Sequence, residues 1–487
     1  MALIIALVVA LACHVQAKAV FAHFMVANSQ NFTIDNWKED ITLAQAAKID
    51  AFALNMGYGS PYAGQILNDA FTAAADLDFK LFFSLDYSGD GHWPQDQVIT
   101  WLSNYTKLPA YYKHNEETPL VSTFEGYEAQ GDWVNIKKKV DCFFVPDWSS
   151  VLPEKLAAAT VADGLMSWNA WPDGTAAMNT SMDERYLSVL KSSSNGTDRP
   201  YIMPVSPWFY TNMVRYNKNW VWQGDDLWYT RWKQVAELEP EYVEILTWND
   251  FGESHYIGPI HEHDLGTFVS GGAPFDYAVG LPHDGWRAFL PYVIDEYKNG
   301  GDGSSAIESE GLVAWYRLSP SWACSAGKTT GNTASQGQTV LPPGEVLTDA
   351  IFFAALLESA AEVSVSIDGQ SESVDWSDTP DGDRGMYFGS VPMDNRTGEV
   401  IVTLTRDGKE LTRVAGQPIS TTCANNNMTN WNAWVGSNLT SLAAGNGSSN
   451  GTSKESGAAA AWSSTRAELR GLLIPVLIVW LGLGFVL

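Results

Sequence analysis

Short apolar runs alternate with longer amphipathic segments over residues 18–300. The short runs are rich in β-branched and aromatic residues, which is typical of buried strands. The segment 36–48 places Ile41, Ala44, Ala47 and Lys48 on one face, as expected for a helix that packs on a sheet. The predicted strands cover residues 20–26, 50–56, 80–86, 120–125, 142–147, 164–169, 201–206 and 242–248. The predicted helices cover residues 36–48, 63–78, 95–108, 131–140, 152–161, 182–193, 226–238 and 283–298.

Eight strands, each followed by a helix, match the count of a (β/α)8 TIM barrel. We therefore predict an α/β fold with this barrel over residues 18–300. A doubly wound sheet would also alternate strands and helices, but it rarely reaches eight such regular units. No glycine-rich phosphate-binding turn follows the first strand, as such a sheet would often have.

The pattern of apolar and polar residues changes after residue 300. A Gly-rich stretch predicts a linker over 301–310, and short alternating runs between Gly, Pro and Asp turns predict a small β-sandwich over 311–424. Residues 425–456 are rich in Asn, Ser, Gly and Thr, which predicts a solvated, glycosylated stalk. Nothing in the sequence indicates what the β-sandwich binds.

Nearly every predicted strand ends in a polar residue. In a TIM barrel the functional side chains lie at the carboxyl ends of the strands, where the loops converge. The residues at these ends are His23, Asn55, Asp86, Glu125, Asp147, Asn169, Ser206 and Asp250.

The stretch TWNDFGES, residues 247–254, follows the eighth predicted strand and places Asp250 and Glu253 three residues apart. Two carboxyl groups at a barrel mouth suit glycoside hydrolysis, in which one is protonated and the other ionised. Burial and mutual repulsion separate the pKa values of such a pair. The D-x-x-E spacing alone is common on ordinary loops. We predict Asp250, Glu253 and Asp86 as catalytic residues.

The chain contains 21 Trp residues, several of them after the sixth and seventh predicted strands. Trp168, Trp171, Trp208, Trp220 and Trp222 could form a wall on which sugar rings stack, or a loop folded around its own small core. We favour the first interpretation. The residues predicted to contact substrate are His23, Asn55, Tyr87, Glu125, Asp147, Trp168, Asn169, Trp208, Trp248, Asn249 and His255.

The formal net charge of −27 makes nucleic acid an unfavourable partner, because the surface repels phosphates. It suits a secreted protein in a mildly acidic medium, and we expect a monomer. The pair HEHD, 261–264, lacks a third metal ligand at a familiar spacing, and DYSGDG, 86–91, lacks the closing Glu of a calcium loop. We predict no metal and no cofactor.

Both ends of the chain resemble targeting signals. Residues 1–17 are apolar and finish in Val-Gln-Ala, which predicts a cleaved signal peptide. Residues 457–487 combine a polar spacer with an apolar tail, which predicts a GPI-attachment signal with Ser456 as the attachment residue. The alternative is a single membrane-spanning helix. We therefore expect a secreted protein at the cell surface or in the cell wall, held to the plasma membrane by the anchor.

Glycosylation and cysteine patterns agree with secretion. We predict a disulfide between Cys324 and Cys423, which flank the β-rich part, and a buried free thiol at Cys142. Nine sequons of the form N-x-S/T predict glycans at Asn31, Asn104, Asn179, Asn195, Asn395, Asn427, Asn438, Asn446 and Asn450.

Motifs on five predicted strands resemble glycoside hydrolase family 71, the fungal endo-α-1,3-glucanases or mutanases. The motifs are VFAHFMV, FFSLDYS, VSTFEG, FFVPDW and LTWNDFGESHYIG. The resemblance covers residues 19–300, and the β-rich part to about residue 425 is similar to the family's C-terminal domain. It implies endo-acting, inverting hydrolysis of α-1,3-glucan in the fungal cell wall, with acids at Asp86, Asp250 and Glu253 essential.

Within that mechanism we expect Glu253 to be the general acid, Asp250 to activate water and Asp86 to orient the sugar or the water. These roles could be exchanged. Inversion needs room for a water, so the two working carboxyl groups should stand ~6.5–9.5 Å apart. Two alternatives remain: a barrel glycosidase acting on another α-linked glycan, such as a mannan, and a GPI-anchored wall-binding protein without catalysis.

Overall fold

The computed structural model describes residues 18–89, 91–193, 199–301 and 303–442. The predicted signal peptide, the GPI-attachment segment with Ser456, and the sequons at Asn195, Asn446 and Asn450 lie outside these residues. Among the described residues, no helix has the length and apolar character needed to cross a membrane.

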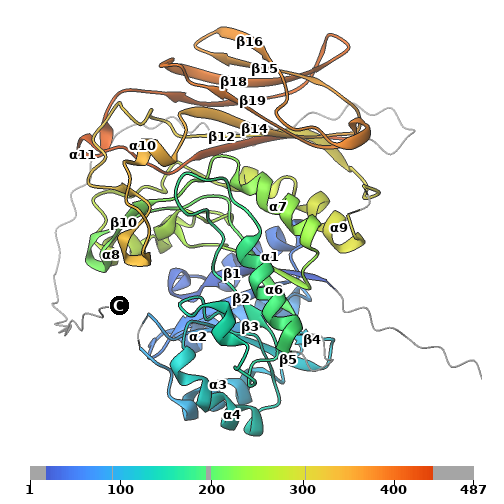
Figure 1. The fold of residues 1–487 in the computed structure, drawn as a ribbon, viewed down its shortest axis with the longest axis vertical. Helices are drawn as coiled ribbons and strands as arrows, with labels where there is room; N and C mark the ends of the chain where they lie inside the picture. Colours follow the sequence, from blue (N-terminus) through green and yellow to red (C-terminus); the bar gives the residue numbers. More distant parts are fainter. Residues whose placement is uncertain (1–17, 90, 194–198, 302, 443–487) are drawn as a thin grey trace, which may run out of the picture. The chain divides into compact units, whose positions relative to one another are not determined.

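A curled, mainly parallel sheet forms the centre of residues 18–300, and helices lie between its strands along the chain (Figure 1). Seven parallel strands follow the order β5-β3-β2-β1-β11-β8-β7, with β6 paired to β5 and the short antiparallel β4 at the edge. The strands are β1 (Ala19–Met25), β2 (Ala51–Gly57), β3 (Lys80–Asp86), β4 (Lys113–His114), β5 (Thr118–Phe124), β6 (Phe143–Phe144), β7 (Leu165–Met166), β8 (Tyr201–Val205) and β11 (Tyr242–Ile245).

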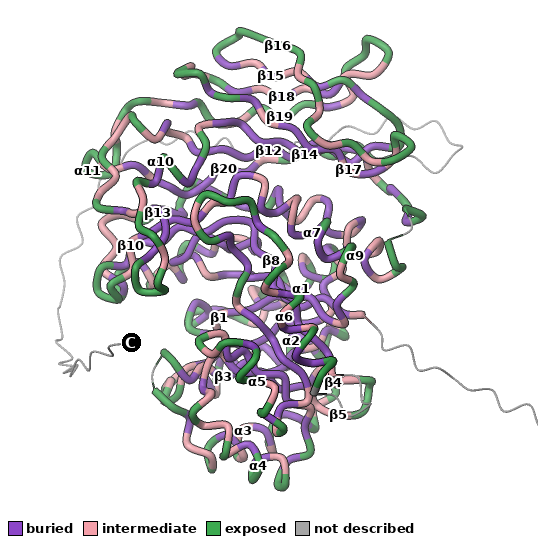
Figure 2. Tube along the Cα trace, in the orientation of Figure 1, coloured by how far each residue is buried: buried purple, intermediate pink, exposed green. Residues whose placement is uncertain are grey.

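The strands of this sheet are buried almost throughout, as Figure 2 shows for β1 and β8. Both faces of a parallel sheet are covered, so its strands are apolar without alternation. The helices are α1 (Ile34–Ala46), α2 (Ala63–Asp76), α3 (Gln95–Tyr105), α4 (Gln130–Lys139), α5 (Pro153–Leu156), α6 (Ser181–Ser193), α7 (Leu227–Leu238), α8 (Gly266–Gly271) and α9 (Leu290–Asn299). Each predicted strand and helix has a counterpart in the predicted order, although α5 is only four residues long. The sequence did not predict β4, α8 or the strands Tyr210–Met213 and Lys218–Val221.

Two four-stranded antiparallel sheets make up the C-terminal part. The inner sheet is β17 (Gly385–Pro392), β14 (Ala350–Leu357), β12 (Ser309–Tyr316) and β20 (Trp434–Ser441). The outer sheet is β16 (Gln370–Val374), β15 (Glu362–Ile367), β18 (Gly398–Arg406) and β19 (Lys409–Ile419). Between them lies a separate apolar core, to which Leu312, Ala314 and Tyr316 of β12 belong.

The inner sheet also packs on the parallel part. Alternate residues of β12, Val313 and Trp315, belong to the core of residues 18–300, because successive side chains of a strand point to opposite faces. Trp315 Nε1 donates to the Asp225 carbonyl at 2.8 Å, just before α7. An apolar cavity of about 190 Å³ lies here, and none of the predicted site residues line it. The two parts thus share one interior.

Two predicted boundaries are wrong. Strand β12 begins at Ser309, inside the predicted linker 301–310, and β20 lies inside the predicted stalk 425–456. The many sequons in this stretch led to the prediction of a stalk. Three apolar side chains among them, Trp431, Trp434 and Val435, are buried instead. Strand β20 pairs with all eight residues of β12, so the folded region extends at least to Ser441.

The cysteine predictions are confirmed. Cys324 and Cys423 form a disulfide across a separation of 99 residues, and Cys142 is a buried free thiol whose pKa burial raises to about 12. The sequon asparagines in the described residues are exposed, namely Asn31, Asn104, Asn179, Asn395, Asn427 and Asn438. Exposure permits the predicted glycosylation without testing it.

The boundary at β20 generates a testable prediction. A chain of residues 18–442 should unfold cooperatively, whereas one of residues 18–429 loses β20 and its buried Trp and Val side chains. Each large buried apolar side chain contributes about 1.5–3 kcal/mol. We expect the shorter chain to melt at least about 10 °C lower in differential scanning calorimetry, or not to fold. Equal melting temperatures would contradict the packing described for β20.

Candidate active site

The segment after β11 folds back on itself. Thr247 N–H donates to the His255 carbonyl at 2.8 Å, and Ile257 N–H donates to the Thr247 carbonyl at 3.0 Å. The Thr247 hydroxyl accepts a hydrogen bond from Asp250 N–H, and the Asp250 carboxylate accepts one from Glu253 N–H at 3.1 Å. Asp250 is thus the N-cap of the one-turn helix Phe251–Glu253, and its carboxylate ties the backbone of Glu253 to its own position.

Hydrogen bonds to β1 and α1 hold this segment in place. The Asn249 amide bonds both backbone groups of Met25 at the end of β1. Trp248 is fully buried, and its Nε1 donates to Asp40 of α1 at 2.8 Å. Asp40 also pairs with His261 at 2.8 Å. The loop is therefore anchored to β1 and α1 by side chains that point away from the acids.

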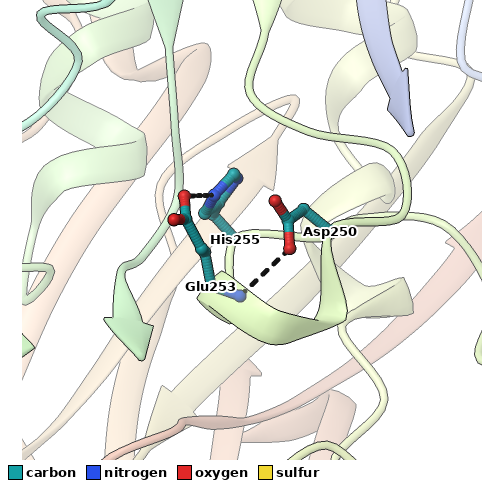
Figure 3. Close-up of side chains that lie close together, drawn as sticks. All are labelled: Asp250, Glu253 and His255. Atoms are coloured by element: carbon teal, nitrogen blue, oxygen red, sulfur yellow. Dashed lines mark hydrogen bonds and ion pairs between the residues drawn. The ribbon is translucent and has the colours of Figure 1, made fainter. Parts of the chain in front are cut away.

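Asp250, Glu253 and His255 form a cluster at the end of β11 (Figure 3). One ligand atom from each lies within 4.8 Å of the others, and His255 Nε2 is 3.0 Å from Glu253 Oε2. Glu253 and His255 are buried, whereas Asp250 keeps part of its surface exposed. The two predicted acids are therefore neighbours.

Lys218, which the sequence did not mark as a site residue, completes the cluster. It lies on β10 (Lys218–Val221), paired antiparallel with β9 (Tyr210–Met213), in the long aromatic loop after β8. Its Nζ is 2.5 Å from Glu253 Oε1. Nothing local marked this lysine, since its partner lies 35 residues further along the chain.

The charges of this cluster shift the pKa values of Asp250 and Glu253 in opposite directions. Burial opposes the ionisation of Glu253, yet Lys218 and His255 together lower its pKa to about 2. Burial, followed by the negative charge of Glu253, raises the pKa of Asp250. Without substrate, the site therefore carries its negative charge on Glu253 and takes up a proton first on Asp250.

Asp250, Glu253 and His255 are also the residue types of a metal site. The Lys218 ammonium lies against Glu253 and supplies the positive charge that a cation would bring. A metal ion would have to displace this ammonium. The arrangement is therefore better suited to acid–base chemistry than to metal binding.

A second acidic group lies at the ends of β3 and β5. Asp86 accepts hydrogen bonds from Ser88 N–H and Gly89 N–H at 2.7 and 2.8 Å. Glu125 accepts from the Ser150 N–H and hydroxyl. After the negative charge of Glu253, those of Asp250 and Asp86 also raise the pKa of Lys218, so Asp86 lies close enough to share its field. Asp86 therefore influences the same lysine as the two acids that follow β11.

Asp147 lies deeper beside this group. Burial raises its pKa far above the ordinary value, and the negative charge of Glu125 raises it further. Burial likewise raises the pKa of Glu125. A protonated Asp147 would lower the repulsion that Glu125 and Asp86 feel at the mouth of the site.

Residues 16–447 match the model of glycosyl hydrolase family 71. The chain belongs to this family. Three curated relatives support the assignment. Mutanase Pc12g07500 of Penicillium rubens is 33% identical over 86% of this chain and 88% of its own. Glucan endo-1,3-alpha-glucosidase agn1 of Schizosaccharomyces pombe is 34% identical over 86% and 94%. The ascus wall endo-1,3-alpha-glucanase of the same yeast is 30% identical over 59% and 68%.

In this family 71 chain, the predicted contact residues divide into two groups. Trp168, Asn169 and Glu125 retain exposed surface near the strand ends. The others are buried: His23, Asn55, Tyr87, Asp147, Trp208, Trp248, Asn249 and His255. Buried side chains can position the site, but they cannot offer a ring face to a sugar unless the site opens.

The predicted wall of stacking tryptophans is wrong for four of its five members. Trp171, Trp208, Trp220 and Trp222 are 1–7% exposed. Three of them, Trp171, Trp220 and Trp222, pack around Phe209. Trp208 instead donates from Nε1 to the Trp431 carbonyl at 3.0 Å. The alternative of a small aromatic core is the observed one. Trp168 alone stays partly exposed, with its ring edge-on to His23 at 4.8 Å between centroids.

Glu244 is a second residue that sequence analysis missed. It lies within β11, is fully buried, and its Oε1 is 2.7 Å from His23 Nδ1 on β1. A charged residue inside an apolar run is a signal that could have been read, because a buried carboxylate requires a partner.

The motif VSTFEG contains a glycine that the fold requires. Gly126 has a φ of +93°, and a Cβ there would lie 2.6 Å from the Tyr87 ring. Glu125 just before it also has a positive φ, of 56°. The close approach of two loops at the ends of β3 and β5 depends on this position.

Replacing Gly126 by Ala should therefore cost about 1–3 kcal/mol of unfolding free energy. The matched control is Gly131→Ala in α4, where a Cβ meets nothing within 4 Å. This substitution should be neutral or stabilise by up to about 1 kcal/mol, because alanine favours helices. Urea unfolding followed by tryptophan fluorescence measures both. A Gly126→Ala variant as stable as its control would mean that the two loops are not constrained here.

Proposed function

We propose that this family 71 enzyme hydrolyses α-1,3-glucan within the polymer chain. The names of the three relatives support this substrate. The observation that carries the proposal is the adjacent pair Asp250 and Glu253 at the end of β11, with Lys218 and His255 holding one of the two acids ionised. The negative charge of Asp86 also raises the pKa of Lys218.

We also infer that the curled sheet is a closed (β/α)8 barrel followed by a β-sandwich. Asp147 forms parallel bridges to Phe124 at the end of β5 and to Met166 of β7. Met166 N–H also donates to the Pro146 carbonyl at 2.9 Å. These contacts support a join between the two ends of the sheet, in which case all predicted site loops leave one rim.

The proposed mechanism needs one acid to protonate the departing glycosidic oxygen and one base to activate a water. A carboxyl oxygen of Asp250 and one of Glu253 lie within 4.8 Å, whereas an inverting pair of carboxyl groups usually stands ~6.5–9.5 Å apart. In an inverting reaction, Glu253 would therefore swing away from Asp250 as the sugar and the water enter. Asp86 would orient the sugar hydroxyls.

The order of the two roles follows from the charge that each acid carries. Before substrate binds, burial and the charge of Glu253 raise the pKa of Asp250, while Lys218 and His255 lower the pKa of Glu253, which favours Asp250 as the acid and Glu253 as the base. The order expected from the sequence, with Glu253 as the acid, requires substrate to break its contact with Lys218 first. The contact between Lys218 and Glu253 therefore favours the first order.

We further propose that the enzyme acts at the cell surface or in the wall, held by a GPI anchor. The apolar tail and the small residues around Ser456 support the anchor. The name of the ascus wall relative supports a wall polymer as substrate.

The assignment predicts that Asp250→Asn and Glu253→Gln variants fold but release sugar from insoluble α-1,3-glucan at least about 100-fold more slowly. Reducing-sugar release measures turnover, and proton NMR of the first product should show the β-anomer if the reaction inverts. Exposed acids provide matched controls, and Asp381→Asn and Glu262→Gln should keep full activity. Full activity in either site variant would refute the assignment. Turnover of a mannan in place of the glucan would identify a different glycosidase.

The order of the roles can be tested with an α-1,3-gluco-oligosaccharyl fluoride, because fluoride leaves without needing a proton. The variant that lacks the acid should keep most of its turnover on this substrate, whereas the variant that lacks the base should not. If Asp250 is the acid, Asp250→Asn retains fluoride hydrolysis. Azide then restores turnover only in Glu253→Gln, giving a β-glycosyl azide. The reverse pattern makes Glu253 the acid.

A further inference from the structure

A third small sheet joins the C-terminal part to the active site. Strand β10 pairs with β9 on one side and with β13 (Thr330–Gly331) on the other, in the order β13-β10-β9. Trp220 and Val221 pair with Thr330 and Gly331. The strand that carries Lys218 is therefore completed by a strand that lies more than a hundred residues later in the chain.

Side-chain contacts between the two segments centre on Asn219. Its Nδ2 donates to the Gly327 carbonyl at 3.1 Å, and its Oδ1 accepts from the Thr329 hydroxyl at 2.7 Å. Thr329 is 4% exposed, so this hydrogen bond is shielded from water. Asn332 N–H extends the pairing by donating to the Val221 carbonyl at 2.9 Å.

The segment from Cys324 to Gly331 is itself fixed to the C-terminal part. Cys324 is linked to Cys423, and Ser325 exchanges backbone hydrogen bonds with Asn427 and Thr429 at 3.0 and 2.8 Å. A covalent bond and a short ladder therefore hold the partner of β10 in place.

Successive side chains of a strand point to opposite faces. Lys218 and Asn219 are consecutive, and Lys218 contacts Glu253 while Asn219 contacts Thr329. A slip of β10 by one residue would turn Lys218 away from Glu253. The pairing with β13 and the hydrogen bonds of Asn219 set the register that puts the ammonium on the acid.

We propose that the C-terminal part serves as a brace for the active site, with Asn219 and Thr329 as positioning residues that hold Lys218 against Glu253. The proposal rests on the proposed function of Glu253. It gives the C-terminal sheets a role in the reaction, independent of any glycan that they bind.

The pH dependence of activity should report whether Lys218 is held against Glu253. Glu253 faces Lys218 from β10, and His255 and Asp250 from its own loop, while Asp86 faces Lys218 from the end of β3. Loosening Lys218 removes positive charge from Glu253 while the other groups stay. The pKa of Glu253 then rises from about 2, so the limb of the pH profile that reports this carboxylate moves to higher pH.

The test compares variants at Thr329 in the full-length protein. Thr329→Val removes the hydroxyl at nearly constant volume and should lower kcat on α-1,3-glucan about tenfold, move that limb of the kcat profile upward by about one pH unit, and leave KM within about twofold. Thr329→Ser keeps the hydroxyl and should retain the wild-type profile. The matched control is Thr412→Val on β19. Its buried hydroxyl has no hydrogen-bond partner within the described part of the chain, so this variant should leave the profile unchanged.

A double-mutant cycle with Lys218→Met separates positioning from general loosening. Lys218→Met should shift the profile in the same direction and further, and adding Thr329→Val to it should shift the profile no more. An unshifted profile in Thr329→Val, or additive shifts in the double variant, would overturn the brace. An inactive Glu253→Gln with an unshifted Thr329→Val profile would refute the brace alone, whereas an active Glu253→Gln would refute the proposed function.

Discussion

A carboxylate that is withdrawn from water needs compensating charge, and the site is arranged around this requirement. Glu253 is 9% exposed, and its two oxygens contact Lys218 and His255 at 2.5 and 3.0 Å. Removing either partner would leave a buried charge partly uncompensated. Because Asp250 shares the same space, the ionised state of Glu253 in turn raises the pKa of its neighbour. One ion pair thus gives two adjacent acids different states.

The partners of Glu253 come from different parts of the chain and are held in place by different contacts. His255 lies among Trp171, Phe209 and the other aromatic residues of the small core after β8. Lys218 depends on β10, which the C-terminal part completes through β13. Among the tryptophans predicted to bind sugar, Trp171 therefore packs against the imidazole instead, and Trp220 lies on β10 itself.

Much of this was readable from the sequence because it is local. Strand ends carry polar residues, so Asp86, Glu125 and Asp250 could be assigned to one edge from periodicity alone. The place of Asp250 and Glu253 after the last predicted strand, together with the family resemblance, singled out the acid pair, and the flanking cysteines identified the disulfide. Lys218 and the aromatic core could not be predicted in this way, because their partners are distant along the chain and an aromatic side chain in a loop suits a core and a sugar site equally well. Strand β20 was missed because the composition of its segment is mainly Asn, Ser, Gly and Thr. Two Trp and one Val in it are buried, and local composition does not distinguish them.

The small sheet β13-β10-β9 also determines when during synthesis the site can become complete. A nascent chain that has reached Gly300 contains all three acids and every strand of the parallel sheet. This nascent chain still lacks β13. It also lacks Cys324 and the disulfide partner Cys423, which lies 99 residues after Cys324. Pairings between distant segments form late, because closing a long loop costs entropy before any contact is gained. The ribosome must therefore deliver the chain as far as Gly331 before the last neighbour of β10 arrives, so a product truncated at Gly300 would contain the acids without the strand that completes the sheet around Lys218.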